Sequence, residues 1–195
     1  MIDNLGLYYD MQITRGGRIV KKYRKRICKS FVKQFLQYLS AQFGYTNGST
    51  RVSITDTSNI SQVVNCVSGY NYTGIHLDAS AADTTYGSQV GIGTTAVTIN
   101  DYKIETLINH GVTAGKLQYS AVVFGTPTTD ATTTTTVVTR VFTNNTGTDV
   151  IVYEISLVGY NGQYYFLLAR DVLASPVTLA NSEGLTLNYS LKTTI

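Results

Sequence analysis

The chain has 195 residues, of which 15 are basic and 12 acidic, and charged residues make up only 14% of it. This length allows one domain with a core large enough to need no disulfide staples. Its two cysteines, Cys28 and Cys66, lie far apart in sequence, which excludes a disulfide-rich secreted scaffold and a zinc ribbon. Because no apolar run reaches the roughly 20 residues that a membrane helix needs, we expect no membrane contact.

The positive charge is concentrated near the N-terminus. Residues 1–33 carry nine basic and two acidic side chains, a net charge of +7, whereas residues 34–195 carry six basic and ten acidic ones, a net charge of −4. A basic region on a weakly acidic body predicts contact with an anionic partner. We favour the acidic face of a neighbouring subunit, with nucleic acid as the alternative because a tyrosine lies among the cations. The predicted contact residues are Arg15, Arg18, Lys21, Lys22, Tyr23, Arg24, Lys25, Arg26, Lys29 and Lys33.

Two elements are expected in this basic region. Residues 1–24 predict a basic extended arm or a hairpin, because Leu7-Tyr8-Tyr9 and Ile19-Val20 flank the turn residues Gly16-Gly17. Residues 25–44 predict an amphipathic basic helix that ends at Gly44. Apolar side chains repeat every four residues along it, and cations gather on the opposite side. The apolar repeat consists of Ile27, Phe31, Phe35 and Leu39.

Residues 45–195 predict a β body. The apolar period becomes two, and turn signals such as Asn161-Gly162 separate short strands. Because tight turns join antiparallel strands, the expected fold is mainly β: an antiparallel β-sandwich or jelly-roll-like body with one N-terminal amphipathic helix and a basic N-terminal arm. The five threonines Thr132 to Thr136 form either a flexible linker or a strand. Residues 101–110 predict a short helix.

No motif in the chain predicts catalysis, and we expect no cofactor and no metal. Residues 91–96, Gly-Ile-Gly-Thr-Thr-Ala, match a loose dinucleotide-binding string, but the residues after them are β-branched and no acid follows at the required distance. His76 and His110 have no second cluster of metal ligands near them in sequence. Glu154 and Arg170, on two strands joined by a hairpin, are expected to form a structural ion pair across the sheet.

Several segments of the chain resemble a group of β-rich virion structural proteins of tailed bacteriophages. The segments are Gly91-Ile92-Gly93-Thr94-Thr95-Ala96-Val97-Thr98, Asp101-Tyr102, Tyr153-Glu154-Ile155-Ser156-Leu157-Val158, Leu167-Leu168-Ala169-Arg170-Asp171-Val172 and Leu185-Thr186-Leu187-Asn188-Tyr189-Ser190-Leu191. Residues 29–36 also look like the N-terminal portion of that group. The resemblance covers about residues 22–195, and it departs at Leu157-Val158-Gly159, where the group shows Gly-Leu-Phe.

The resemblance implies a non-enzymatic subunit of the virion, made in the host cytoplasm: a capsid accessory, vertex or head–tail connector component. It implies further copies of the chain and capsid or portal proteins as partners, with packaged DNA as the other candidate for the basic region. It carries over no catalytic residue. The alternative is a host-attachment or glycan-binding module on the virion, in which exposed rings of Tyr70, Tyr72 and Tyr86 stack on sugars.

Overall fold

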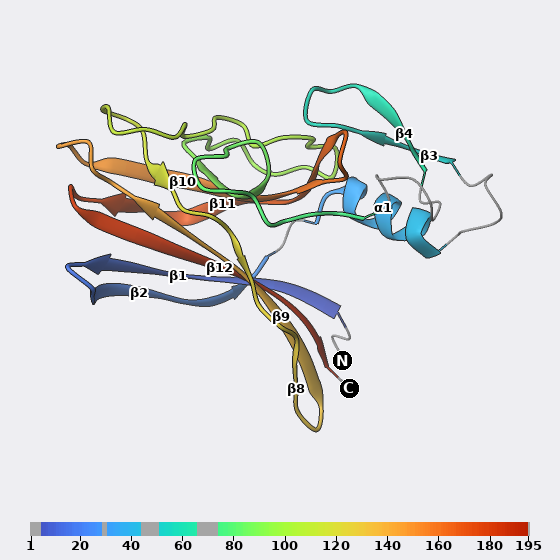
Figure 1. Cartoon of the computed structure of the whole chain (residues 1–195), viewed down its shortest axis with the longest axis horizontal. Coiled ribbons are helices and arrows are strands. Elements are labelled where there is room, and N and C mark those ends of the chain that lie inside the picture. Colours follow the sequence, from blue (N-terminus) through green and yellow to red (C-terminus); the bar gives the residue numbers. More distant parts are fainter. Residues whose placement is uncertain (1–4, 29–30, 44–50, 66–73, 195) are drawn as a thin grey trace.

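The computed structural model describes residues 5–28, 31–43, 51–65 and 74–194 (Figure 1). This part of the chain is mainly β, and all pairings between its strands are antiparallel, which confirms the predicted fold class at that level. One α-helix, α1 (Lys33–Phe43), lies within the described ranges. No helix in these ranges has the length and apolar character needed to cross a membrane.

The larger of the sheets contains both ends of the described chain. In spatial order its strands are β2 (Arg18–Ile27), β1 (Leu5–Arg15), β12 (Glu183–Thr194), β9 (Thr133–Thr143) and β6 (Gln118–Tyr119). Two short strands, β7 (Val123–Phe124) and β8 (Thr128–Thr129), also pair with β9. β1 and β12 pair from Leu5↔Thr193 to Arg15↔Glu183, so the N-terminal hairpin is built onto the C-terminal strand.

A second sheet lies across the first. It consists of β11 (Tyr165–Leu179), β10 (Val150–Tyr160) and β5 (Gly87–Gly91). The predicted turn at Asn161-Gly162 joins β10 to β11, but the last pair is Tyr160↔Tyr165, so the loop has four residues rather than two. The Asn161 side chain closes the loop, since its Oδ1 accepts hydrogen bonds from the N–H groups of Gln163 at 3.0 Å and Tyr164 at 2.7 Å.

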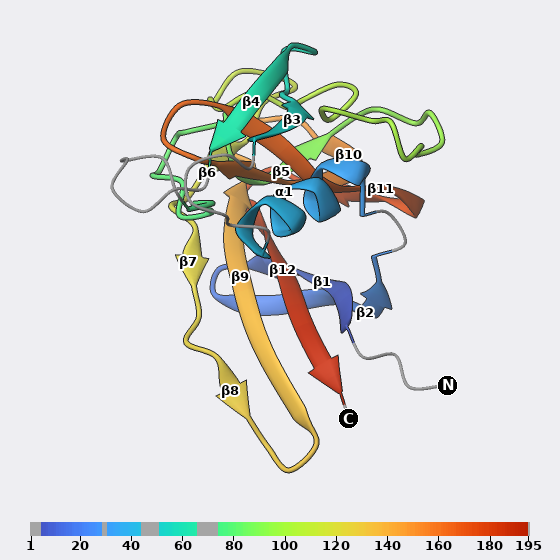
Figure 2. The same cartoon turned by 90° about the vertical axis from the view of Figure 1, so that its right-hand side faces the viewer.

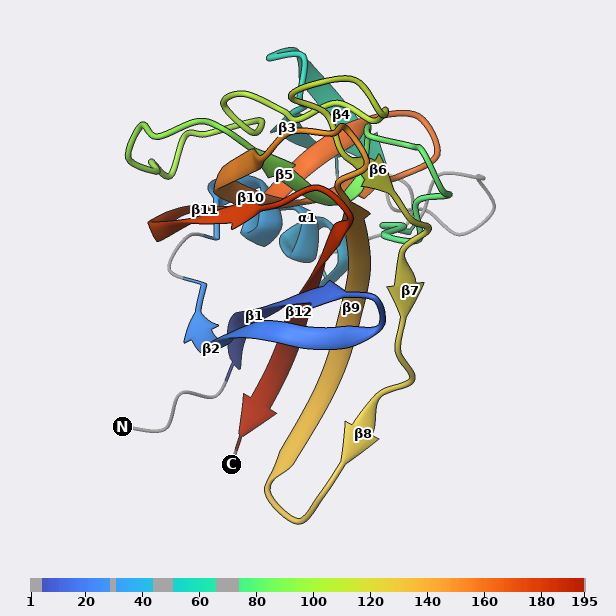
Figure 3. The same ribbon diagram turned by 90° about the vertical axis from the view of Figure 1, so that its left-hand side faces the viewer.

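The core lies between these two sheets (Figure 3). The period of two along β1 buries Leu7, Tyr9, Met11 and Ile13, and they join one cluster with buried side chains of β10, β11 and β12. Full burial of an aliphatic or aromatic side chain contributes about 1.5–3 kcal/mol, so this cluster supplies the main driving force for folding.

One side of the core is incompletely filled. An apolar cavity of about 110 Å³ lies between the sheets, and its lining includes Phe35, Phe124, Thr136, Leu168 and Leu191. Beyond it the β8–β9 hairpin extends away from the second sheet (Figures 2 and 3). The threonine run therefore lies in a strand: Thr133 to Thr136 begin β9 and pair with β12.

The N-terminal segment forms a hairpin rather than a free arm. Gly16 (φ 55°) and Gly17 (φ 76°) occupy the left-handed region, and Arg15↔Arg18 is the closing pair. Two successive residues with positive φ define the turn whose twist matches a two-residue hairpin, and glycine adopts this conformation at no steric cost.

The predicted basic helix at residues 25–44 is wrong in its first part. β2 continues to Ile27, because Tyr8↔Ile27 and Tyr9↔Arg26 extend the ladder with β1, and the Cys28 N–H donates to Leu7 O at 2.8 Å. The helix starts at Lys33, eight residues later than expected. Phe31 and Phe35 keep their predicted spacing and stack with centroids 4.1 Å apart, but Ile27 is exposed. Long-range strand pairing thus overrides the local helical period.

A small third sheet packs on α1. It pairs β3 (Arg51–Thr55) with β4 (Ser61–Asn65), and its Ile54 and Val64 form a separate apolar cluster with Tyr38 and Phe166. Residues 101–110 are predicted to form a short helix but form a loop instead. The N–H groups of Glu105 and Thr106 in this loop donate to the Glu154 carboxylate.

Candidate functional site: a basic edge strand

β2 gathers most of the predicted contact residues on one strand at the edge of the larger sheet. Six of its ten residues are cations, and all six are exposed. They are Arg18, Lys21, Lys22, Arg24, Lys25 and Arg26. Since a strand rises about 3.3 Å per residue, the eight steps from Arg18 to Arg26 make a line of charge about 26 Å long.

These six charges are not neutralised within the described structure. None of the six side chains lies within ion-pair distance of a described carboxylate. Arg15, the remaining predicted cation of the hairpin, differs: its Nη2 lies 2.8 Å from Glu183 Oε1, across the β1–β12 ladder. The hairpin therefore presents β2, rather than β1, as its charged surface.

The tyrosines of the hairpin are covered rather than displayed. Lys21 Nζ lies 4.9 Å from the centroid of the Tyr23 ring, and Lys25 Nζ lies 4.9 Å from that of Tyr8. The Tyr23 ring is half-buried and packs on the core. Such cation–π contacts at exposed sites contribute about 0.5–1 kcal/mol and hold the ammonium groups along the strand. Tyr23 thus positions a lysine and is not an exposed stacking ring.

The two side-chain faces of β2 differ. Lys21, Tyr23 and Arg26 share the face of Ile13, Met11 and Tyr9, their register partners on β1. The opposite face carries Lys22 and two isoleucines, and three apolar side chains of β2 are more than half exposed. These three are Ile19, Val20 and Ile27, at 51%, 53% and 55%. The contact residues predicted from the sequence were the cations and Tyr23, and these three exposed apolar side chains were not among them.

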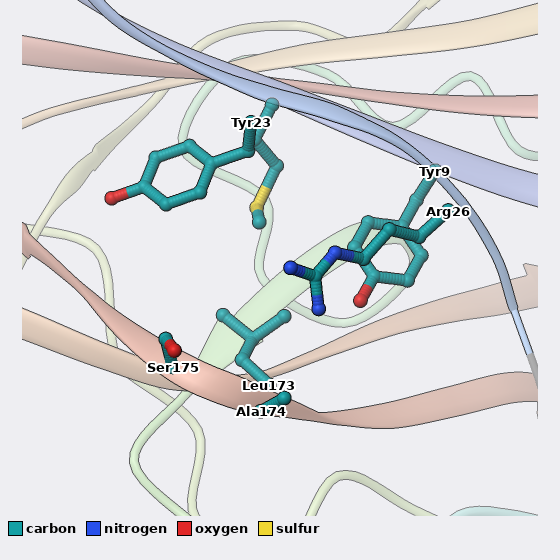
Figure 4. A pocket seen from close by; sticks show the side chains of 7 residues that line it. Tyr9, Tyr23, Arg26, Leu173, Ala174 and Ser175 are labelled. Atoms are coloured by element: carbon teal, nitrogen blue, oxygen red, sulfur yellow. The ribbon is translucent and has the colours of Figure 1, made fainter.

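A narrow groove separates β2 from β11 (Figure 4). Tyr9, Tyr23 and Arg26 lie above it, and residues 173–175 of β11 lie below. Its cavity is only about 20 Å³, room for one water molecule. The chemistry of β2 is therefore that of an exposed surface and not of a ligand pocket.

The other predicted contact residues lie elsewhere. Lys33 begins α1, and its Nζ donates to Asn100 Oδ1 at 3.0 Å, so the structure does not bring it into the β2 line. Lys29, Tyr70 and Tyr72 lie outside the described residues. Tyr86, predicted to be an exposed aromatic contact, is half-buried and packs against two other tyrosine rings, with centroids 5.3 and 6.1 Å away. The prediction that Tyr86 is an exposed aromatic contact is therefore wrong, because its loop folds the ring onto the second sheet.

The predicted pair of Glu154 and Arg170 is present, and it belongs to a larger network. Arg170 Nε lies 2.7 Å from Glu154 Oε2, Nη1 lies 2.8 Å from Asp101 Oδ2, and Nη2 lies 3.0 Å from Glu105 Oε2. The Glu154 carboxylate also accepts the N–H groups of Gly93, Glu105 and Thr106 at 2.9, 3.1 and 2.8 Å. These bonds fix residues 93–106 on the second sheet, which explains why no helix forms at 101–110.

The network has electrostatic consequences but offers no free reactive group. Hydrogen bonds from Thr95, with the Arg170 charge as a smaller contribution, hold the pKa of Glu105 below its ordinary value. Burial would lower the pKa of Arg170, but hydrogen bonds to Glu154 and Asp101 outweigh it and raise that pKa. Because the arginine occupies the centre of the three carboxylates, their joint role is structural.

A second arginine, Arg140, was not singled out from the sequence. It is fully buried on β9, and it donates only to main-chain oxygens, among them Ser120 O at 2.9 Å and Ser88 O at 3.0 Å. Burial lowers its pKa, while the Tyr119 ring 4.7 Å from its Cζ helps to retain the charge. It fastens the loops at residues 80–88 and 120 to β9 and is not available to a partner.

Most carboxylates of the body are also used internally. Glu154, Glu183, Asp56 and Asp171 are buried, and Asp171 accepts a hydrogen bond from the Cys28 thiol. Of the described carboxylates outside the ion pairs with arginine, the exposed ones lie on three separate loops. They are Asp78, Asp130 and Asp149. These exposed carboxylates therefore come from three different segments of the described body.

Within the described ranges, no three His, Cys, Asp or Glu side chains are grouped so as to hold a metal ion. His76 Nδ1 lies 3.9 Å from Asp78 Oδ1, and both side chains are exposed. Comparison with known proteins gives no further guide, since no family model, no curated protein and no solved structure matches this chain.

Proposed function

We propose that this chain is a non-enzymatic virion structural protein with a β-sandwich body, and that it docks through β2 on an acidic surface of a neighbouring capsid or portal subunit. The observation that carries the proposal is the line of six exposed cations on an edge strand, none of them paired with a described carboxylate. Self-association and a place in the particle belong to the same proposal.

The rest of the structure supports a role in assembly. The hairpin is rigidly built onto the C-terminal strand through eleven register pairs, so its charge is held at a fixed position relative to the body. Preorganisation of this kind reduces the entropy lost on docking. Complementary charges then mainly increase the association rate and fix the orientation of the partner.

The proposal is tested by charge removal on β2. Poly-L-glutamate serves as the acidic probe, and the variant is the triple substitution Lys21→Gln, Lys22→Gln, Lys25→Gln. We expect its affinity for polyglutamate to fall at least about tenfold at low salt, because three charge contacts are lost. Fluorescence anisotropy with labelled polyglutamate measures this change.

The matched control removes three lysines from elsewhere on the chain: Lys103→Gln, Lys116→Gln, Lys192→Gln. Net charge changes equally in the two triple variants, so a difference between them reports the position of the charge. Equal loss of binding in both variants would show a non-specific effect of net charge and contradict the proposal.

A second candidate function, glycan binding, is favoured by a different observation. An open groove of about 420 Å³ is lined by Tyr165, Gln89, Lys103 and Glu105, together with hydroxyl side chains. A tyrosine ring offers an apolar surface on which a sugar can stack, and the neighbouring polar groups can bind the sugar hydroxyls. The hydroxyl residues of the lining are Thr57, Ser58, Thr84 and Thr85.

The two candidates give different results in a glycan-array experiment. A glycan-binding module should retain a discrete set of sugars in the β2 triple variant and lose them on Tyr165→Ala. Tyr153→Ala, which truncates a tyrosine outside this groove, is the control. If no sugar binds the unmodified protein, this second candidate is rejected.

A further inference from the structure

We infer that β2 is a docking edge for an acidic, extended segment of another protein, which adds to the larger sheet as one more strand. The inference rests on the proposed docking role of β2 and specifies the form of the partner. It joins two features of the same ten residues, an open main-chain edge and a line of cations that pair with no described carboxylate.

The main chain of β2 is available on its outer side. β2 is the last strand of its sheet, and β1 is its one partner among the described strands. In Figure 1 no other described element lies below β2 at the left of the view. The Cys28 N–H donates to Leu7 O, and N–H directions alternate along an antiparallel ladder, so the Ile27 N–H points away from β1. An added strand would satisfy this donor and others like it.

The side chains of β2 specify what such a strand would carry. On the core-side face, Lys21 and Arg26 call for acidic neighbours directly across the new ladder. On the other face, Ile19 and Ile27 call for apolar neighbours, and both are more than half exposed, whereas Lys22 between them calls for an acidic one. The complementary segment therefore carries acidic residues toward one face and mainly apolar residues toward the other, which is close to an alternation along an extended strand.

A second copy of β2 does not fit this edge. Pairing two such strands would place six cations against six, and like charges directly opposite one another destabilise a sheet. Lysines on edge strands often serve only to prevent such self-pairing. Prevention of self-pairing does not explain the three exposed β-branched side chains among the cations. They leave apolar surface uncovered, which is typical of a binding surface.

Nucleic acid is a weaker match than a peptide strand. Phosphate contacts would use the cations but neither the open edge nor the isoleucines. Two of the three tyrosine rings of the hairpin, Tyr8 and Tyr23, are covered by lysines, and the third, Tyr9, is buried, so none is displayed for base stacking.

Three probes separate these possibilities: a labelled decapeptide of alternating glutamate and valine, its block isomer with all glutamates before all valines, and a single-stranded DNA decamer. The peptides have the same composition and charge. We expect the alternating peptide to bind at least about tenfold more tightly than the block isomer, since it alone can present acids to one face and valines to the other. Hydrogen exchange at the Ile27 amide should slow with the alternating peptide and not with DNA.

Replacing Ile27 by proline, which removes the outward-pointing N–H, provides the matched test. Ile27→Pro removes that donor without changing charge and should weaken the alternating peptide about tenfold while leaving DNA affinity unchanged. Ile27→Thr keeps the N–H and should retain most of the binding. Unchanged DNA affinity and an unchanged melting temperature show that Ile27→Pro still folds.

The inference is overturned if the block isomer or the DNA binds as tightly as the alternating peptide, or if Ile27 exchange does not slow. Failure of the underlying docking role looks different. In that case the Lys21, Lys22, Lys25 triple variant would bind polyglutamate as the unmodified protein does, whatever the peptide pattern.

Discussion

Arg170 shows how one side chain organises a region that is irregular in secondary structure. Its guanidinium holds Asp101, Glu105 and Glu154 together at 2.7 to 3.0 Å, and Glu154 in turn binds three main-chain N–H groups. A buried charge network of this kind tolerates removal of one member poorly, because the remaining charges stay buried.

Glu154→Gln is therefore expected to lower the free energy of unfolding by about 3 kcal/mol, since it leaves the Arg170 charge without its most buried partner. Urea-induced unfolding followed by circular dichroism measures the change. Asp149→Asn, which neutralises an exposed carboxylate with no described ion-pair partner, should stay within about 0.5 kcal/mol of the unmodified protein. Equal effects of the two substitutions would contradict the structural role of the network.

The same network predicts a pH dependence at Glu105. Its pKa is held below the ordinary value of 4.5 by Thr95 and Arg170. A depressed folded-state pKa gives stability that is present above the unfolded-state pKa and is lost as the pH falls through the folded-state value. Glu105→Gln should therefore destabilise the protein at neutral pH, and the difference should disappear below the folded-state pKa. Paired urea titrations across the acidic range measure it, and a difference that persists at the acid limit would contradict this assignment.

At the scale of elements, the apolar cavity leaves room for additional side-chain volume. Thr136 lines it from β9, and its register partner Leu191 is more than one-third exposed. Thr136→Ile should raise the free energy of unfolding by about 1 kcal/mol by adding buried methyl and methylene groups while keeping a β-branched residue in the strand.

Thr134→Ile is the matched control for the cavity prediction. Thr134 lies two residues earlier on the same face of β9, but it is exposed and outside the lining. The same substitution there should change stability little. Thermal unfolding measures the change in stability of both variants. A larger increase in stability for Thr134→Ile would show that strand propensity rather than cavity filling is responsible.

The elements also show which features were predictable from sequence. Predictions from the sequence were confirmed where they depend on one turn and its two flanking strands. Examples are the hairpin at Gly16-Gly17 and the Glu154–Arg170 ion pair. The helix start failed because residues 25–27 pair with β1, a long-range contact that the repeat of apolar residues does not encode. Arg140 was missed because its partners are main-chain oxygens, whose positions depend on the folded loops.

At the scale of the whole molecule, the sequence predicted the positive charge of the candidate surface but not that the charge lies along an exposed edge strand. The sequence shows nine cations in nineteen residues, and the structure collects six of them on one exposed strand while it places Lys33 at the start of α1. Apart from the Glu154–Arg170 pair, the internal use of the carboxylates was not predictable either, because it follows from the tertiary fold. That use matters, since it removes four of the ten carboxylates of residues 34–195 from the surface.

This charge distribution leads to a prediction about self-association. If the chain forms oligomers, we expect the contact surfaces to be the low-charge parts of the β body, because β2 strands repel one another and the exposed carboxylates outside the ion pairs with arginine lie on three different loops. The mass measured by sedimentation should then be the same at about 0.1 M and about 1 M salt, although the Debye length falls from about 10 Å to about 3 Å. The Lys21, Lys22, Lys25 triple variant should have that same mass. An oligomer that dissociates at high salt, or in the triple variant, would instead make β2 an ionic clasp between copies, and the acidic partner would have to be sought within the chain itself, including its residues outside the described ranges.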